Sequence, residues 1–339
     1  MPLPAAIHDY LAHALTTWPT APRYVTLIGG GSHSPRGLPC AACGHPWTSE
    51  DVVQYIPTDL LFVDRWQGLI PTDYTYATLI GDDLLPDIAV GRLAVSNTVE
   101  LAAVIDKIIL YEENLNNDKS WLQNILFVAD NADDGGNFPA ANAATAARLP
   151  NEYNSTLLEQ VPDADAADVA ILRADMSEHI NAPNGGVSIL NYRGHGSVNR
   201  WADPPAILDT SVDFWNNSSS PLIILSADCL DGYFAWPAFE SLGRDFLTRP
   251  SVGSAAHWSS TGLGLTSEHT VLHQAFYDGI FDHRQTNIGD AINYAKTVYA
   301  ESAYMPSGES ELYSFTLQGD PAMRVYYVFD NVYLPLVVK

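Results

Sequence analysis

Residues 187–197 have the sequence Val-Ser-Ile-Leu-Asn-Tyr-Arg-Gly-His-Gly-Ser, an apolar run that ends in a histidine between two glycines. A second run, Pro-Leu-Ile-Ile-Leu-Ser at 221–226, is followed by Ala-Asp-Cys at 227–229. Both runs are continuous rather than alternating, which predicts buried strands of a parallel sheet. Open α/β sheets carry their functional residues just beyond the carboxyl ends of such strands. His195 and Cys229 are therefore predicted to share one crevice, in the arrangement of a cysteine nucleophile with a histidine partner.

The charge balance argues against an anionic binding partner. The 339 residues include 16 Lys and Arg against 40 Asp and Glu, a formal net charge of −24. Such a chain is not expected to bind nucleic acid or an anionic membrane through a basic face, whereas it suits a secreted protein or one that binds calcium. No run reaches the roughly 18 apolar residues of a membrane span. The N-terminus lacks the features of a signal peptide, so the chain taken literally is cytoplasmic, although a truncated or processed chain would look the same.

Three cysteines are too few for a disulfide framework. Cys40 and Cys43 form a C-x-x-C motif beside His45, in a loop rich in glycine and proline. This motif is compatible with a zinc site, a local disulfide or two plain loop cysteines. Because no second ligand pair follows at a usual spacing, an inert or disulfide-bonded loop is favoured over metal. Cys229 has no obvious partner and is either a core residue or a nucleophile.

The expected elements alternate between strands and helices, which predicts an α/β fold. Strands are expected at 24–28, 87–93, 125–129, 187–192, 221–226, 251–256 and 322–328, and helices at 98–114, 140–149, 165–180, 238–248, 267–279 and 288–302. Residues 29–73 are expected to be irregular. The polar stretch 114–120 divides the chain into an N-terminal subdomain at 1–118 and a second subdomain at 119–328, followed by a tail at 329–339.

The expected chemistry is acyl transfer by a thiolate. A free thiol is only a few per cent ionised at neutral pH, and a neighbouring histidine raises that fraction and can protonate a leaving amine. The backbone N–H groups of Gly196 and Cys229 are candidates for an oxyanion hole, at about 3 kcal/mol per donor. Asp133 and Asp134, on the loop after the 125–129 strand, are the best-placed acids to orient His195.

Each of these residues also has a structural interpretation. Cys229 on its own is equally well explained as a core cysteine, and His195 as a turn residue. The acidic, glycine-rich segment 130–136 is more typical of a turn than of catalysis. The conjunction of a histidine and a cysteine that both close apolar strands favours the functional interpretation.

Two further motifs carry less weight. His269 and His273 are spaced i,i+4 on an expected helix, where an exposed helix face is favoured over a metal pair. Gly29-Gly30-Gly31-Ser32 follows the first strand in the position of a phosphate loop. It matches neither G-x-x-x-x-G-K-[ST] nor G-x-G-x-x-G, so it indicates nucleotide binding only weakly.

Together these motifs resemble the gingipain family of cysteine peptidases, in the clan that also holds caspases and legumain. The similar blocks occur in the family's order over about residues 5–328. They are the first-subdomain segment 73–92, the histidine block 184–197 with Trp201, the cysteine block 225–234, the strand 252–256 and the closing segment 317–324.

The resemblance implies two stacked three-layer α/β/α subdomains, the second caspase-like with a mostly parallel sheet. It implies that Cys229 is the nucleophile, that His195 is the catalytic histidine, and that Asp134, or less favourably Asp133, is its acidic partner. It also implies structural calcium, with ligands that cannot be assigned here, and a secreted or cell-surface location. The chemistry itself needs no cofactor, the substrate is a protein or peptide, and a monomer is expected.

The sequence departs from the family at the places that select substrates. The acid that would hold a basic side chain should lie downstream of Gly136, where this chain has Asn142, Ala143, Ala144 and Thr145. Thr145 and, in the altered pocket wall, Trp258 are therefore the candidate substrate-binding residues, and a preference for basic residues does not carry over. The secretory leader, propeptide and sorting module common around such domains are not seen, which leaves export open.

The sequence thus predicts a cysteine endopeptidase that works through an acyl-enzyme thioester. One alternative is a transpeptidase, in which an amine resolves the same intermediate. The other is a non-catalytic cell-surface scaffold, which the lost specificity acid favours and the intact His195 and Cys229 oppose.

Overall fold

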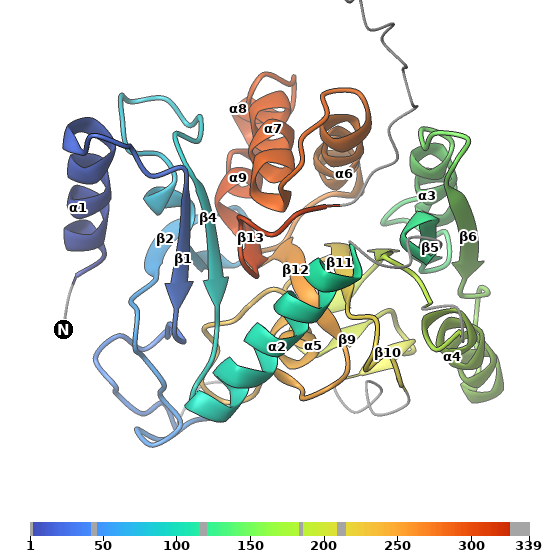
Figure 1. The fold of residues 1–339 in the computed structure, drawn as a ribbon. Coiled ribbons are helices and arrows are strands. Elements are labelled where there is room, and N and C mark those ends of the chain that lie inside the picture. The colour runs from blue at the N-terminus through green and yellow to red at the C-terminus, as the bar shows by residue number, and fades with distance from the viewer. Residues whose placement is uncertain (1–2, 42–45, 116–120, 183–185, 209–214, 326–339) are drawn as a thin grey trace, which may run out of the picture.

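The structure is a computed structural model that describes residues 3–41, 46–115, 121–182, 186–208 and 215–325. Its centre is an eight-stranded sheet in the order β1-β4-β13-β12-β11-β7-β5-β6. The β1/β4, β5/β6, β5/β7, β7/β11 and β11/β12 pairs are parallel, and β12/β13 is antiparallel. Figure 1 shows α6 and α7 on one side of this sheet, and α2 and α5 on the other. The predicted α/β class with a mostly parallel sheet is confirmed.

The strands are β1 (Tyr24–Ile28), β2 (Asp59–Asp64), β3 (Gly68–Thr72), β4 (Ala89–Leu93), β5 (Asn124–Ala129), β6 (Asn154–Glu159), β7 (Ile189–Arg193), β8 (Gly196–Ser197), β9 (Arg200–Trp201), β10 (Ile207–Leu208), β11 (Leu222–Ala227), β12 (Ser254–Ser260) and β13 (Phe315–Gln318). The helices are α1 (Pro4–Thr17), α2 (Thr98–Asn114), α3 (Phe138–Ala146), α4 (Ala166–Ile180), α5 (Leu242–Thr248), α6 (Thr266–Phe281), α7 (Ile288–Ala300), α8 (Met305–Gly308) and α9 (Ser310–Ser314), with short 3₁₀ turns at Tyr74–Tyr76 and Trp121–Gln123.

The central strands are buried on both faces, which explains their unbroken apolar runs. In β5, Ile125 and Phe127 belong to the core under α6 and α7, whereas Leu126 and Val128 belong to the core that includes α4 and α5. The strands β7 and β11 repeat this alternation, with odd-numbered residues toward α6. Any side chain at an odd position of β7 therefore faces α6.

Helix starts agree well with their capping residues. The Asn97 side chain accepts hydrogen bonds from the N–H groups of Val99 and Glu100 and begins α2. Asp165 forms a capping box with Asp168 and begins α4. Short polar side chains at these positions satisfy N–H groups that have no partner within the helix, so the sequence locates both starts closely.

Several predicted elements are wrong. Among the described residues the last strand is β13, before the Gly319 turn, and residues 322–325 of the strand expected at 322–328 form none. The helix expected over 238–248 begins only at Leu242. The stretch expected to be irregular contains the β2/β3 hairpin, and β6 and α1 were not expected. The strands β13 and β6 are short and partly polar, so their pairing with a neighbouring strand, rather than their own pattern, determines them.

The division of the chain near residue 118 stays a prediction, because it falls at 116–120, outside the described residues. On either side of it, β1 and β4 join the same sheet as β5, β6, β7, β11 and β12, with β13 between the two groups. Over the part of the chain that the structure describes, no helix is both long and apolar enough to cross a bilayer.

Candidate active site

The site is built on the carboxyl ends of three adjacent strands. Arg193 of β7 is in register with Ala129 of β5 on one side and with Ala227 of β11 on the other. His195 lies two residues after Arg193 in the chain, and Cys229 lies two residues after Ala227. The loop that carries Asp133 begins directly after Ala129, the last residue of β5. Neighbouring strands lie about 4.8 Å apart, so the three segments emerge side by side.

Asp133 is the carboxylate that faces His195. Its Oδ2 atom lies 2.9 Å from the histidine Nε2 atom, and its Oδ1 atom accepts a hydrogen bond of 2.7 Å from the Gly135 N–H. Partial burial raises the pKa of Asp133, but the hydrogen bonds from Gly135 and His195 outweigh it and hold the pKa below the ordinary value of 3.8. Asp134, the acid preferred from the sequence, forms no such contact. The turn from Asp133 to Gly136 directs the first of the two acids at the ring.

The backbone of His195 is held by residues that the sequence analysis did not select. Its N–H donates to Asp130 Oδ2 at 3.3 Å, and its carbonyl accepts from the Tyr192 hydroxyl at 2.7 Å. The ring meets Phe138 edge-on, with centroids 5.3 Å apart. Burial raises the pKa of Asp130. The sequence signal that could have selected Asp130 is its position as the first acid after β5, because functional residues of an α/β sheet lie at the carboxyl ends of its strands.

Cys229 is partly exposed and holds its proton in the free protein. Its Sγ atom lies 3.9 Å from the Gly264 carbonyl oxygen. Burial, reinforced by the nearby carboxylates of Glu311 and Asp64, raises the pKa of the thiol to about 11. At neutral pH the sulfur therefore needs a base before it can act as a nucleophile. The Cys229 N–H makes no hydrogen bond with any described residue, which leaves it free to bind an oxyanion.

Close packing at Gly196 brings the histidine and cysteine segments together. A β-carbon at this position would lie 1.8 Å from Asp228 Oδ2 and 2.7 Å from the Cys229 carbonyl oxygen. Real side chains do not tolerate such distances, so only glycine allows the approach. The two predicted oxyanion donors, Gly196 and Cys229, thus lie on contacting segments.

Two buried acids lie beneath Cys229. Asp228 is wholly buried, accepts a hydrogen bond of 2.9 Å from the Ser226 hydroxyl, and has its pKa raised well above 3.8 by burial and by Asp231. Asp231 accepts hydrogen bonds from Trp201 Nε1 at 2.8 Å and His257 Nε2 at 3.1 Å. Burial opposes ionisation of Asp231, yet His257 and Trp201 bring its pKa below the ordinary value. Burial and Asp231 therefore oppose ionisation of Asp228, whereas His257 and Trp201 favour ionisation of Asp231.

Two predicted substrate-binding side chains do not reach solvent. Thr145 lies inside α3 with no exposed surface, and its hydroxyl donates to the Ala141 carbonyl. Trp258, also without exposed surface, lies beneath α6 and stacks on His273 at a centroid distance of 5.4 Å. Each side chain points into the core because it occupies the inward face of its helix or strand. Neither lines a substrate-accessible surface in this structure.

The expectation that His269 and His273 lie on an exposed helix face is also wrong. Both side chains are buried, and His269 Nε2 lies 3.2 Å from Glu311 Oε2. Within the described ranges, no three His, Cys, Asp or Glu side chains gather into a set fit to hold a metal. The calcium implied by the family resemblance stays a prediction without assigned ligands.

The C-x-x-C motif is described only in part. Cys40 is disulfide-bonded, which removes its thiolate as a zinc ligand. Cys43 and His45 lie outside the described residues.

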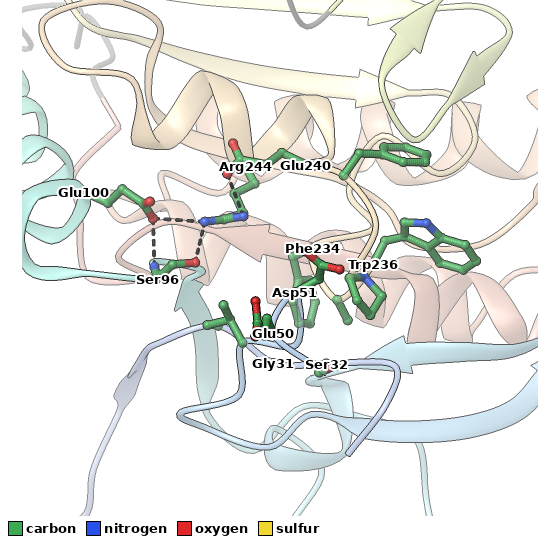
Figure 2. A pocket seen from close by; sticks show the side chains of 15 residues that line it. Gly31, Ser32, Glu50, Asp51, Ser96, Glu100, Phe234, Trp236, Glu240 and Arg244 are labelled. Atoms are coloured by element: carbon green, nitrogen blue, oxygen red, sulfur yellow. Dashed lines mark hydrogen bonds and ion pairs between the residues drawn. The ribbon is translucent and has the colours of Figure 1, made fainter. Parts of the chain in front are cut away.

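The glycine run after β1 does not form a phosphate loop. The N–H groups of Gly29 and Gly30 donate to the carbonyls of Leu93 and Val95. Gly31 lines a pocket of about 280 Å³ that also holds Glu50, Asp51 and Glu240 (Figure 2). The carboxylates around this pocket would repel a phosphate, so nucleotide binding is not supported here.

A second hollow, of about 640 Å³, opens beside His195 and Asp133. Asp130, Gly196 and Arg200 contribute to its wall. His195 lines this hollow, whereas Cys229 is not among its lining residues.

The fold and the strand-end residues together define a caspase-like α/β protein with a cysteine and a histidine at one sheet edge. The structure superposes on that of the Arg-specific cysteine proteinase gingipain R with a TM-score of 0.73 and 20% identity, over 95% of this chain and 68% of that one. The complex of the Porphyromonas gingivalis RgpB pro- and mature domains gives 0.74 at 20% identity, over 95% of this chain and 70% of that one. At this identity the superpositions establish the fold.

The sequence comparisons identify the family. The model of Peptidase family C25 matches residues 2–326, and the chain belongs to this family. Gingipain R2 from Porphyromonas gingivalis is 26% identical over 271 residues, which are 76% of this chain and 35% of that protein. Lys-gingipain W83 from the same organism is 33% identical over 165 residues, 48% of this chain and 9% of that protein. The chain therefore spans about a third or less of these relatives.

Proposed function

We propose that this chain is a cysteine endopeptidase whose reacting groups are Cys229 and His195. The observation that carries the proposal is the row of three paired strand ends from which Cys229, His195 and Asp133 emerge. Membership in a peptidase family supports the same reaction class.

In the proposed mechanism, His195 acts first as a base. It takes the thiol proton as the Cys229 sulfur attacks the peptide carbonyl and a carbon–sulfur bond forms. The N–H groups of Cys229 and Gly196 bind the oxyanion. The imidazolium then gives its proton to the leaving amine, the carbon–nitrogen bond breaks, and a thioester remains. Water, deprotonated by His195, hydrolyses the thioester and restores the thiol.

Asp133 supports both roles of the histidine. Its carboxylate faces Nε2 and is ionised at neutral pH, so it orients the ring and stabilises the imidazolium. Calcium, export and the monomeric state are proposed from the resemblance alone and have no step in this mechanism.

The test is hydrolysis of casein and of a mixed peptide library by the wild-type chain, Cys229→Ala and His195→Ala. We expect cleavage that iodoacetamide abolishes and that both variants lose by at least about a thousandfold. Matched unfolding curves would show that the variants fold. Hydrolysis that survives Cys229→Ala would remove the mechanism. If the folded wild-type chain cleaves nothing, and a thiol probe labels Cys229 no faster than free cysteine, the scaffold alternative holds instead.

A further inference from the structure

Arg193 is a buried cation at the active-site edge that the proposed mechanism does not use. It is the last residue of β7, two positions before His195, and its side chain is wholly buried. Its Nη1 atom donates to the Thr270 hydroxyl at 2.9 Å. Its Nε and Nη2 atoms have no hydrogen-bond partner among the described residues. A guanidinium offers five donors in a planar fork, so most of this fork is unused.

No described carboxylate compensates this charge. The ionisable side chain that acts on it is the phenol of Tyr277, whose hydroxyl is already 3.3 Å from Asn191 Oδ1. Burial lowers the pKa of Arg193 to about 10, which still leaves the group charged at neutral pH. A buried, unpaired cation is strongly unfavourable, and a chain with 40 acidic residues has many carboxylates from which a partner could have come. The open fork is therefore suited to an anion from outside the chain.

The position of Arg193 relates it to the reacting atoms. It is in register with Ala227, two residues before Cys229, so it lies one strand away from the nucleophile. It faces α6, as do the other odd-numbered residues of β7. The N-terminus of this 16-residue helix lies on the same side, where its dipole also favours negative charge.

Arg193 has no exposed surface, so a ligand needs an opening to reach it. The turn that holds Asp133 meets the first residue of α6, where the Thr266 hydroxyl donates to the Gly135 carbonyl at 2.8 Å. This hydrogen bond is exposed, and exposed hydrogen bonds exchange with water at little cost. A substrate side chain that binds Arg193 must therefore enter on the side of the sheet that α6 covers.

We propose that Arg193 binds the side-chain carboxylate of an aspartate or glutamate in the substrate, at the residue whose carbonyl Cys229 attacks. This inference rests on the proposed peptidase function and supplies its substrate class. Carboxylate and guanidinium form two parallel, charge-assisted hydrogen bonds, which suits the unused Nε and Nη2 atoms.

The test is a set of fluorogenic peptides that differ only at this residue: Asp, Glu, Asn, Leu, Lys and Arg. For the wild-type chain we expect kcat/KM for Asp or Glu to exceed that for Asn by about 10- to 100-fold, the range of a charged hydrogen-bonded pair. Arg193→Met should bring the acid-to-Asn ratio to within about threefold of one. A wild-type preference for Lys, Arg or Leu, or a ratio that Arg193→Met leaves unchanged, would overturn the proposal.

A matched control separates this role from a structural one. Lys107, on α2, is another buried basic side chain, and burial lowers its pKa to about 7, but its Nζ donates to the carbonyls of Phe246 and Val252, both at 2.9 Å. Lys107→Met should lower the melting temperature and leave the acid-to-Asn ratio unchanged. Arg193→Met should leave the melting temperature unchanged or raise it, since it removes an unpaired charge. A fall in melting temperature like that of Lys107→Met, without a change in ratio, would make Arg193 structural.

Two more outcomes are informative. If sulfate raises the melting temperature of the wild-type chain but not of Arg193→Met, and the peptide ratio is near one, Arg193 binds a free anion and the proposal is wrong. If none of the peptides is cleaved and an aspartyl ketone does not label Cys229, the peptidase function fails together with the specificity. Cleavage without acidic preference removes the specificity alone.

Discussion

Arg92 and Arg193 are both wholly buried in strands of one sheet, yet their surroundings differ completely. Arg92, in β4, donates to the two oxygens of Asp73 at 2.6 and 2.8 Å and to three backbone carbonyls. Arg193, in β7, donates to one threonine hydroxyl. The first arginine has the full pairing that a buried charge requires, whereas the second lacks it at the edge where the chemistry is proposed.

The difference extends to the groups around each arginine. Beside Arg193, the same sheet edge also holds Asp228, whose pKa is raised well above its ordinary value and whose Oδ2 atom has no described partner. Arg244 is an intermediate case: it is mostly buried and paired with Glu100, Glu240 and Ser96 (Figure 2). Arg92 and Arg244 are therefore paired within the chain, whereas Arg193 lacks a carboxylate partner at the edge where a ligand is proposed.

The largest expected effect tests the satisfied side of this comparison. Asp73→Ala leaves the Arg92 guanidinium buried without its carboxylate, which should destabilise the chain by about 3–5 kcal/mol. Urea unfolding measures this change. Asp73→Asn keeps one acceptor and should lose less. A loss below about 1 kcal/mol for Asp73→Ala would mean that the two arginines do not differ as their pairing indicates.

A smaller and pH-dependent effect is expected at Asp228. Its pKa is raised above 3.8 in the folded state, so the folded chain holds a proton that the unfolded chain releases. The contribution of this bound proton to the free energy of unfolding is complete below about pH 3.8 and declines as the pH rises toward the folded-state pKa. Asp228→Asn is neutral at every pH and should therefore gain stability relative to wild type between pH 4 and 7.

The measurement is the difference in unfolding free energy between wild type and Asp228→Asn across that range. Asp231 titrates below its ordinary pKa and is common to both proteins, so it cancels in the difference. A difference that stays constant with pH would show that Asp228 is ionised in the folded state.

The sequence predicted the site residues that follow apolar strands better than those whose position depends on the geometry of a turn. His195 and Cys229 follow continuous apolar runs, and the sheet places them accordingly. The choice between Asp133 and Asp134 depends on a tight turn and the Gly135 N–H, which no periodicity encodes. Arg193 falls in the histidine block 184–197 without a role of its own, because its missing partner is visible only in three dimensions.

The same limit explains the errors in the fold. The helices expected at 98–114 and 165–180 begin at Thr98 and Ala166, close to the expected positions, because capping by Asn97 and Asp165 is a local interaction. The four-residue β13 was misplaced because its partners, β12 and β4, are distant in sequence. Thr145 and Trp258 were expected to bind substrate, but both side chains are buried. The sequence alone does not show which face of their helix or strand meets the core.

A near-neutral effect on stability is expected at the ion pair of His195 and Asp133, which are proposed to act in catalysis. His195 and Asp133 keep 53% and 37% of their side-chain surface exposed, so solvent screens their attraction. Asp133→Asn should change the free energy of unfolding by less than about 0.5 kcal/mol and lower kcat/KM about 10- to 100-fold, the typical effect of losing an orienting partner. Asp134→Asn is the matched control and should change neither. Equal losses of activity in the two variants would remove the distinction between the acids.

The smallest effect is expected at Arg244, where pairing is redundant. Glu240 is 45% exposed, and without it Arg244 still donates to the Ala94 carbonyl, Ser96 and Glu100. Glu240→Gln should therefore alter the free energy of unfolding by at most about 0.5 kcal/mol, whereas Glu100→Gln, whose carboxylate also caps the start of α2, should cost more. If Glu240→Gln cost as much as Asp73→Ala, the contribution of each arginine to stability would depend on its number of ion pairs rather than on burial. Arg193, which has no described ion pair, would then contribute to stability through packing alone.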